Sequence, residues 1–399
     1  MSAPVLLLTN VRPAGRALTS ILVQDGRIAA IDPNVAADNV ETIDGAGALM
    51  LPGLVEAHTH LDKTLYGMKW YRNEVGPRLI DKIDNERAMR KGLGIDPARQ
   101  SARQAILSVG HGTTHIRTHV DIDTVVGLAG VAGVMATRER LRDVVDIEIV
   151  AFPQSGMLVR PGTIELMDEA LRMGAEVVGG IDPSGIDRNP KGHLDTIFAM
   201  AQRFARSVDI HLHEPGELGA FAIELIIERT KALGMQGRVT LSHAFCLGMP
   251  DSVATDALIG ELCEAGIHIM TTGSASRPVP SVKRLREAGV TVCSGNDGIR
   301  DTWGPYGNGD MLERAMLVGL RNNLRRDDEL ELALDICTYG GAKVMALENY
   351  GLEPGCCADF VLVEAEAIAE AVAARPPRKL VVKRGRIVAR DGRALTEAP

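Results

Sequence analysis

The sequence lacks several features that would place it in a specialised class of protein. No apolar stretch reaches the roughly eighteen residues that span a bilayer, so we expect no membrane partner. The start, MSAPVLLLTNVRPAG, has no basic region before its short apolar run, and we expect no signal peptide. The net charge is -8 and no long run of Lys or Arg occurs, which argues against nucleic acid as the main partner.

Cysteine is scarce as well. The chain of 399 residues has six cysteines, and only Cys356 and Cys357 are close in sequence. They form neither a disulfide framework nor a Cys-x-x-Cys metal site, so a cytoplasmic location is expected. Any metal must then be held by His and carboxylate side chains. Aromatic residues make up only 3% of the chain, so aliphatic residues must fill the interior.

The two ends of the chain resemble each other. ALTSILVQDGRIAAIDP predicts two strands joined at Asp25-Gly26, and KLVVKRGRIVARDG repeats that pattern after ADFVLVEA. We therefore expect residues 1–50 and 355–399 to form one small β-sandwich. Residues 51–354 would be a separate domain between its two halves.

The middle of the chain alternates short β-branched runs with helical periodicity. The expected strands are 53–58, 113–120, 146–152, 176–181, 208–213, 238–243, 267–272 and 290–295. The expected helices are 97–109, 164–174, 193–206, 217–233, 251–265, 280–288, 309–325 and 329–347. Eight such units in about 300 residues predict an α/β fold, a (β/α)8 TIM barrel. A doubly wound sheet is the alternative, but no Gly-x-Gly-x-x-Gly follows the first strand.

Residues 61–96 interrupt this alternation. The segment has no clear strand and carries many charges together with Trp70 and Tyr71. Because it follows the first barrel strand, it would cover the C-terminal mouth of the barrel. It is either a lid or a surface insertion.

Titratable residues collect at the expected C-terminal ends of strands, where barrel enzymes carry their catalytic groups. His58 and His60 share one strand face because alternate residues point the same way, and His211 and Asp297 end two other strands. Burying these groups together is costly without a cation. We expect them to bind one divalent metal ion, zinc or iron, with manganese as a further candidate.

A metal in this setting lowers the pKa of a bound water to about 7 and so supplies a hydroxide nucleophile. Glu214 follows His211 by three residues. It could accept the proton of the water and pass it to a leaving nitrogen. His243, at the end of the next strand, could orient the hydroxide, and Asp297 could act as ligand and base.

These motifs resemble the metal-dependent amidohydrolase superfamily over nearly the whole chain. The resemblance rests on PGLVEAHTHLDK, the histidine of the fifth strand, SHAFC and the aspartate of the eighth. HIRTHVD, IVAFPQSG and Asp301-x-Trp303 are similar to the cytosine deaminase branch. NDGIRDTWGPYGNGDM is closer to N-isopropylammelide isopropylaminohydrolase-like members, which act on s-triazines. The resemblance implies one metal on His58, His60, His211 and Asp297, with Glu214 as proton shuttle, His243 beside the nucleophile and Gln154 bonded to the heterocycle.

Further substrate contacts are expected from His119, Lys63 and Trp303. His119 would touch either the ligands or the substrate, Lys63 would reach the pocket or be a solvated lid lysine, and Trp303 would stack on a flat ring. Cytosine deaminases carry an acidic residue where this chain has Gly298. We expect the missing side chain to leave space beside the ring, which makes a substituted heterocycle more suitable than cytosine.

The fourth strand, VVGGI, has no lysine of the kind that bridges two metals in binuclear members, which favours a mononuclear site. The leading hypothesis is hydrolytic deamination of a cytosine-like base or s-triazine at a cyclic amidine carbon. Hydrolysis of a cyclic amide or imide is the alternative, and an inactive binding protein is a third. The expected partner is a small heterocyclic substrate, and analogy with the family suggests a homo-oligomer.

Overall fold

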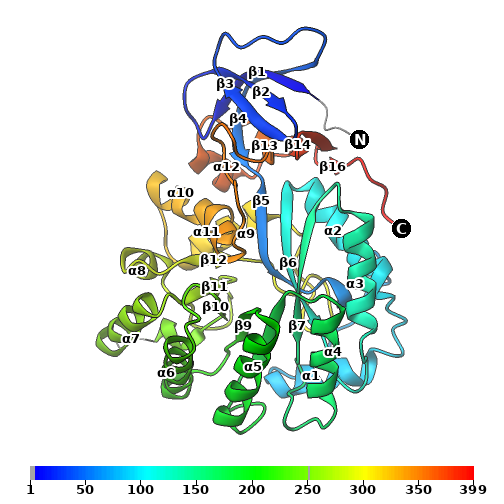
Figure 1. The fold of residues 1–399 in the computed structure, drawn as a ribbon, viewed down its shortest axis with the longest axis vertical. Coiled ribbons are helices and arrows are strands. Elements are labelled where there is room, and N and C mark those ends of the chain that lie inside the picture. The colour runs from blue at the N-terminus through cyan, green and yellow to red at the C-terminus, as the bar shows by residue number, and fades with distance from the viewer. Residues whose placement is uncertain (1–4, 250–251) are drawn as a thin grey trace.

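The barrel predicted from the sequence is confirmed in a computed structural model that describes residues 5–249 and 252–399. Eight parallel strands follow one another in chain order around one sheet (Figure 1). An isolated parallel bridge between Thr59 and Asp297 joins the first strand to the segment after the last. The strands are β5 (Leu54–Thr59), β6 (Thr113–Asp121), β7 (Asp146–Phe152), β8 (Val177–Ile181), β9 (Ser207–His211), β10 (Val239–Ser242), β11 (His268–Thr271) and β12 (Val292–Ser294).

Helices cover the outside of the barrel, and most begin and end near the predicted positions. They are α2 (Pro97–Gly110), α3 (Ala129–Arg140), α4 (Thr163–Met173), α5 (Pro190–Phe204), α6 (Gly216–Ala232), α7 (Ser252–Glu264), α8 (Val282–Glu287), α9 (Met311–Arg321), α10 (Asp327–Asp335) and α11 (Tyr339–Val344). Residue 251, where the fifth predicted helix begins, lies outside the described residues.

The observed helices differ from the predicted ones in two places. The single helix expected over 329–347 is divided into α10 and α11, because Gly340 and Gly341 bring α11 against the backbone of β12 and the side chain of Val55. Helix α3 was not predicted, because its apolar pattern is weak. Gly133 in α3 lies so close to Pro97 that a β-carbon there would overlap it.

The predicted sandwich of the two termini is confirmed as an eight-stranded sheet with the order β16-β15-β14-β13-β4-β1-β2-β3. The strands are β1 (Leu6–Pro13), β2 (Thr19–Gln24), β3 (Arg27–Ile31), β4 (Glu41–Pro52), β13 (Phe360–Val363), β14 (Arg378–Lys383), β15 (Arg386–Arg390) and β16 (Arg393–Ala394), with α12 (Ile368–Ala374) between β13 and β14. Strands from both ends of the chain share one apolar cluster that includes Leu8, Ile21, Phe360 and Val382.

The resemblance between the two ends is also visible in their turns. Asp25 and Gly26 join β2 to β3 with φ of 51° and 74°, and Arg384 and Gly385 join β14 to β15 with φ of 46° and 74°. Two consecutive residues with positive φ form the turn that best matches the twist of a hairpin.

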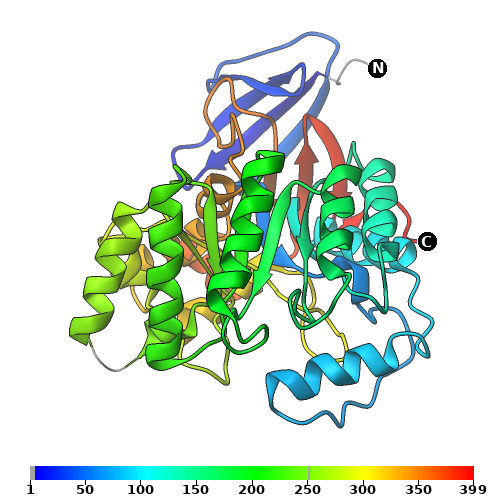
Figure 2. The same cartoon turned by 60° about the horizontal axis from the view of Figure 1, so that its bottom comes forward.

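The terminal sheet lies at the N-terminal end of the barrel, where β4 leads directly into β5 (Figure 1). The opposite end holds helix α1 (Leu79–Met89), which stands apart from the helical ring in Figure 2. This helix and the short η1 (Leu61–Lys63) are the regular parts of segment 61–96. The domain boundaries at 50/51 and 354/355 stay a prediction, as does lid motion of this segment. Within the described residues, no helix is long and apolar enough to cross a membrane.

Candidate active site

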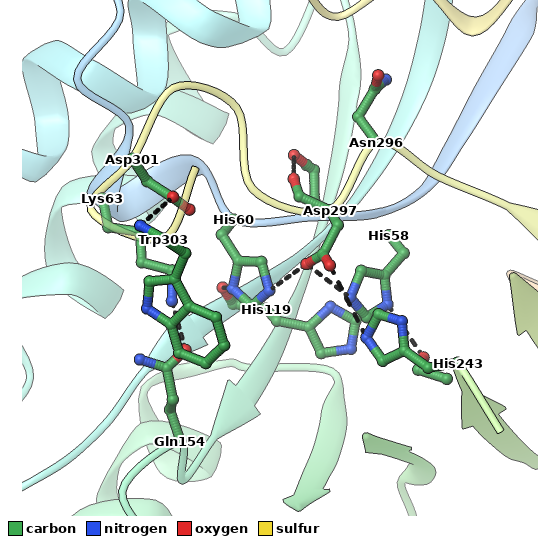
Figure 3. Close-up of polar contacts among 12 residues, drawn as sticks. His58, His60, Lys63, His119, Gln154, His243, Asn296, Asp297, Asp301 and Trp303 are labelled. Atoms are coloured by element: carbon green, nitrogen blue, oxygen red, sulfur yellow. Dashed lines mark hydrogen bonds and ion pairs between the residues drawn. The ribbon is translucent and has the colours of Figure 1, made fainter. Parts of the chain in front are cut away.

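The four predicted metal ligands come together at the C-terminal end of the barrel. Figure 3 shows three of them, His58, His60 and Asp297. His58 lies near the end of β5 and His60 directly follows that strand, while His211 ends β9 and Asp297 follows β12. One potential ligand atom from each residue lies within 4.8 Å of those of the others. Asp297 Oδ1 is 3.1 Å from His60 Nε2 and 3.6 Å from His58 Nε2.

The hydrogen bonds behind these histidines determine which ring nitrogen faces Asp297. His60 Nδ1 is 3.1 Å from the carbonyl oxygen of His119, which can only accept a hydrogen bond. His58 Nδ1 is 3.0 Å from Ser242 Oγ, and that hydroxyl donates at 2.6 Å to Asp209 Oδ1. Both Nδ1 atoms therefore carry the proton, and both Nε2 lone pairs point at the cluster, as metal ligation requires.

The electrostatics of the cluster suit a divalent cation. Burial lowers the pKa of His60 and holds that of His211 well below its usual value, so both rings are neutral. Burial alone would raise the pKa of Asp297, but contacts with His58 and His60 hold it well below its ordinary range. Among the described residues, His58 Nε2 and both ring nitrogens of His211 are buried without a hydrogen-bond partner. Neutral imidazoles with open lone pairs beside one carboxylate are a suitable donor set for a metal.

His243 lies next to this cluster, as expected. Its Nε2 is 4.0 Å from Asp297 Oδ2, and its ring stacks on that of His213 at 4.6 Å between centroids. His243 and Asp297 both have left-handed backbone conformations, with φ of 73° and 63°. Such conformations cost energy in residues other than glycine and concentrate at functional sites.

Glu214 is held by one carboxylate oxygen only. Its Oε1 accepts hydrogen bonds from the backbone N–H groups of Ser184 at 2.7 Å and Gly185 at 2.6 Å. Its Oε2 is buried and has no hydrogen-bond partner among the described residues. Burial raises the pKa of Glu214, although the two amides oppose this effect. The carboxyl group does not open onto the adjoining cavity in this conformation.

A cavity of about 290 Å³ adjoins the cluster. His60, His211 and Asp297 line it, together with the predicted substrate contacts Lys63, Gln154, Gly298 and Trp303. Lys63 is buried and its Nζ lies 2.5 Å from Gln154 Oε1 and 5.3 Å from the centre of the Trp303 ring. The lysine is therefore part of the pocket wall and is not solvated. Trp70, in contrast, is 68% exposed and stacks with Arg300 outside the cavity.

The surroundings of Gly298 differ from the expectation. A β-carbon at this position would overlap Asp301 Oδ2, so the carboxylate of Asp301 occupies the space that we expected to be empty. Asp301 is buried, and its Oδ1 accepts the backbone N–H of Trp303 at 2.7 Å. Burial raises the pKa of this carboxyl group.

His119 lies behind the ligands. It is fully buried, its ring centre is 4.0 Å from that of His58, and its Nε2 is 3.5 Å from Asp209 Oδ1. It does not line the cavity. Of the two roles expected for this residue, these distances favour contact with the neighbouring histidines, and a substrate contact stays a prediction.

Several residues at the site were missed in the sequence analysis. Asp209 points inward from β9 and is paired with the buried Arg117 at 3.2 Å. Glu86 and Lys82 come from α1, and Lys82 lines the cavity beside Trp303. Asp209 could have been found from its position two residues before His211 on the same strand face. Nothing in the charged sequence of α1 distinguishes Glu86 from a solvated residue.

Comparisons with known proteins agree with this site. The sequence model of the Amidohydrolase family matches residues 41–389. The chain is 35% identical over 372 residues to the N-isopropylammelide isopropyl amidohydrolase of Pseudomonas sp. (strain ADP), covering 92% of each protein. The crystal structure of N-isopropylammelide isopropylaminohydrolase from Burkholderia multivorans ATCC 17616 is 51% identical, with a TM-score of 0.96 over 98% of this chain and 100% of the other.

A second solved structure extends the comparison to a pyrimidine enzyme. The 5-methylcytosine deaminase from Klebsiella pneumoniae liganded with 5-fluorocytosine is 30% identical and has a TM-score of 0.85 over 98% of each chain. The family match and these relatives cover almost all of the chain, including the strands that carry the His and Asp cluster. The chain therefore belongs to the amidohydrolase family and is a hydrolase of carbon–nitrogen bonds.

Proposed function

We propose that this protein is a mononuclear aminohydrolase that removes an alkylamine from an amino-substituted s-triazine such as N-isopropylammelide. The observation that carries this proposal is the convergence of four ligand atoms within 4.8 Å at the edge of a cavity lined by Lys63, Gln154 and Trp303. The 51% identity to an enzyme named for N-isopropylammelide supports the choice of substrate.

We assign the metal to His58, His60, His211 and Asp297. Zinc and iron are the first candidates and manganese the next, because all three accept imidazole and carboxylate. One ion is proposed because β8 supplies no lysine to bridge a second. When bound, the metal supplies a water acidic enough to form hydroxide near neutral pH, and it polarises the bond under attack.

The protein side chains then position the reacting groups and move the proton. Asp297 Oδ2 lies on the side of His243, so these two residues can hold the nucleophile between them. Glu214 has the only carboxylate oxygen among the proposed catalytic groups that is buried and without a partner. We propose that its side chain turns toward the cavity, accepts the proton of the nucleophile and delivers it to the departing amine.

Substrate recognition is assigned to the wall opposite the metal. The cavity of about 290 Å³ is at the low end for ligand sites and suits one ring with a short substituent. Trp303 offers an aromatic face to that ring. Lys63 and Gln154 provide a cationic donor and an amide beside it. Asp301, above Gly298, brings a carboxylate to the cavity from a different position than the acidic residue of cytosine deaminases.

A substrate panel tests the proposal. Metal-loaded protein would be incubated with N-isopropylammelide, ammelide, cytosine, 5-methylcytosine and isoguanine, and the products would be measured by mass spectrometry and amine release. We expect N-isopropylammelide to give isopropylamine and a ring carbonyl with the ring intact. A ring-opened product would support cyclic amide hydrolysis instead. No turnover of any compound would overturn the proposal.

Two further expectations belong with this function. The six cysteines are free thiols, which supports a reducing cytoplasm as the location. A homo-oligomer is proposed from family analogy alone. Light scattering of the purified protein would measure the oligomeric state.

A further inference from the structure

Glu86 has an unusual place behind the substrate wall. It lies on α1, within the 61–96 segment, yet its side chain is buried. Its Oε2 accepts hydrogen bonds from Gln154 Nε2 at 3.0 Å and from the Trp303 indole N–H, and lies 3.4 Å from Lys63 Nζ. One oxygen atom thus contacts three side chains that line the cavity, each from a different segment of the barrel mouth (Figure 3 shows these three side chains).

The same contacts determine how Gln154 faces the cavity. Its two amide hydrogens are directed to Glu86 Oε2 and to Asp121 Oδ2, the latter at 3.1 Å, and its oxygen accepts from Lys63. A carboxylate can only accept hydrogen bonds and an ammonium group can only donate them. The oxygen and nitrogen of the Gln154 amide therefore cannot exchange places. Gln154 therefore offers the cavity only the remaining lone pair of its oxygen, next to the positive charge of Lys63.

We propose that Glu86 is a positioning residue that determines substrate specificity in this enzyme. It holds Gln154 with the amide oxygen toward the cavity and fixes the ring of Trp303, so that the wall presents an acceptor beside a cationic donor. A ring edge with N–H next to C=O matches this wall, whereas an edge whose ring N–H is methylated does not. This inference rests on the proposed function, since it concerns the same pocket.

The wider contacts of Glu86 explain how a carboxylate can be buried there. Its Oε1 accepts from Arg90 Nη1 at 3.0 Å, and Arg90 also pairs with Asp62 and Asp121. Two cations and several hydrogen-bond donors therefore surround it and oppose the loss of hydration, although burial and the neighbouring carboxylate of Asp121 still raise the pKa of Glu86. Because Glu86 lies on α1 and Arg90 directly follows its last residue, this helix is tied to the substrate wall rather than resting on the surface.

The test uses full-length, metal-loaded protein with Glu86→Gln and Glu86→Asp. Glu86→Gln keeps the shape of the side chain but removes its charge and gives it donors that can turn Gln154 around. Glu86→Asp keeps the charge but shortens the side chain by one methylene, which moves the carboxylate away from its partners. This variant provides the test if Glu86→Gln does not fold. Asp84→Asn, an exposed acidic residue on the same helix, is the matched control.

Two readouts separate positioning from a general structural role. The first is kcat and KM for N-isopropylammelide and for its ring-N-methyl analogue. We expect kcat/KM for the parent to fall about 10- to 100-fold, mostly through KM, as for a lost hydrogen bond to a charged group. The preference for the parent over the analogue should shrink while metal content is unchanged. The second is Trp303 fluorescence in a Trp70→Phe background, where it is the remaining tryptophan, and its emission should shift in the Glu86 variants.

Unchanged KM, discrimination and emission in the Glu86 variants would overturn this inference. The inference would also be overturned if Asp84→Asn raised KM, reduced discrimination and shifted the emission as the Glu86 variants do. Any disturbance of α1 would then have the same effect. Failure of the proposed function has a different signature, because the wild-type enzyme would then turn over no compound in the panel. The emission of Trp303 would still decide whether Glu86 holds that ring.

Discussion

Replacing Glu214 by Gln is the sharpest test of the proposed chemistry. Glu214 Oε1 accepts two backbone N–H groups, and a glutamine oxygen can accept the same two. The amide would then place its NH2 where the unpartnered Oε2 lies. A neutral amide oxygen accepts these hydrogen bonds more weakly than a carboxylate oxygen does. The substitution should therefore lower the free energy of unfolding by about 1 kcal/mol. The variant should therefore fold and keep its metal.

Its turnover should fall far more than its stability. An amide cannot take up the proton of the nucleophile, and general acid–base catalysis contributes about 10²- to 10⁴-fold to a rate. That loss corresponds to about 3–5 kcal/mol in the activation barrier. We expect kcat to fall by this factor for N-isopropylammelide, with KM little changed because Glu214 does not line the cavity.

The pH profile gives an independent check. Glu214 must be deprotonated to accept a proton, and burial raises its pKa. Activity of the wild type should therefore decline as pH falls through this raised pKa, and that decline should be absent from the residual activity of Glu214→Gln. Glu217→Gln, an exposed residue three positions further on, is the control. Wild-type turnover in Glu214→Gln, with normal metal content by elemental analysis, would refute the proton-transfer role.

Three other substitutions test the site from different sides. Asp297→Ala should lose metal and activity together, and full metal content in that variant would remove Asp297 from the ligand set. Ser242→Ala breaks the hydrogen bond to His58 Nδ1 and should weaken metal affinity about 10- to 100-fold, measured by competition with a chelator; unchanged affinity would contradict this link. Gly298→Ala forces a β-carbon against Asp301 and should lower the free energy of unfolding by about 1–3 kcal/mol, so an unchanged denaturation midpoint would show that Asp301 moves aside freely.

Local patterns were sufficient for the barrel and for the convergence of His58, His60, His211 and Asp297. Short β-branched runs predicted all eight barrel strands, and the 3.6-residue period predicted most of the helices between them, because both signals are properties of short segments. Parallel strands in one barrel end at the same rim. The side chains at these strand ends therefore had to meet. They are His58 and His60 at the end of β5, His211 at the end of β9 and Asp297 after β12.

Only the tertiary structure placed Glu86, Asp301 and the Asp209–Ser242–His58 chain. The sequence by itself determined which residues form the His and Asp cluster beside the pocket, since strand direction alone brings them there. It did not determine what fills the pocket wall, because a charged helix such as α1 has the same pattern whether it is solvated or buried. The cost of burying the Glu86 carboxylate is reduced only when Arg90, Lys63, Gln154 and Trp303 converge on it. That convergence depends on the packing of four separate segments.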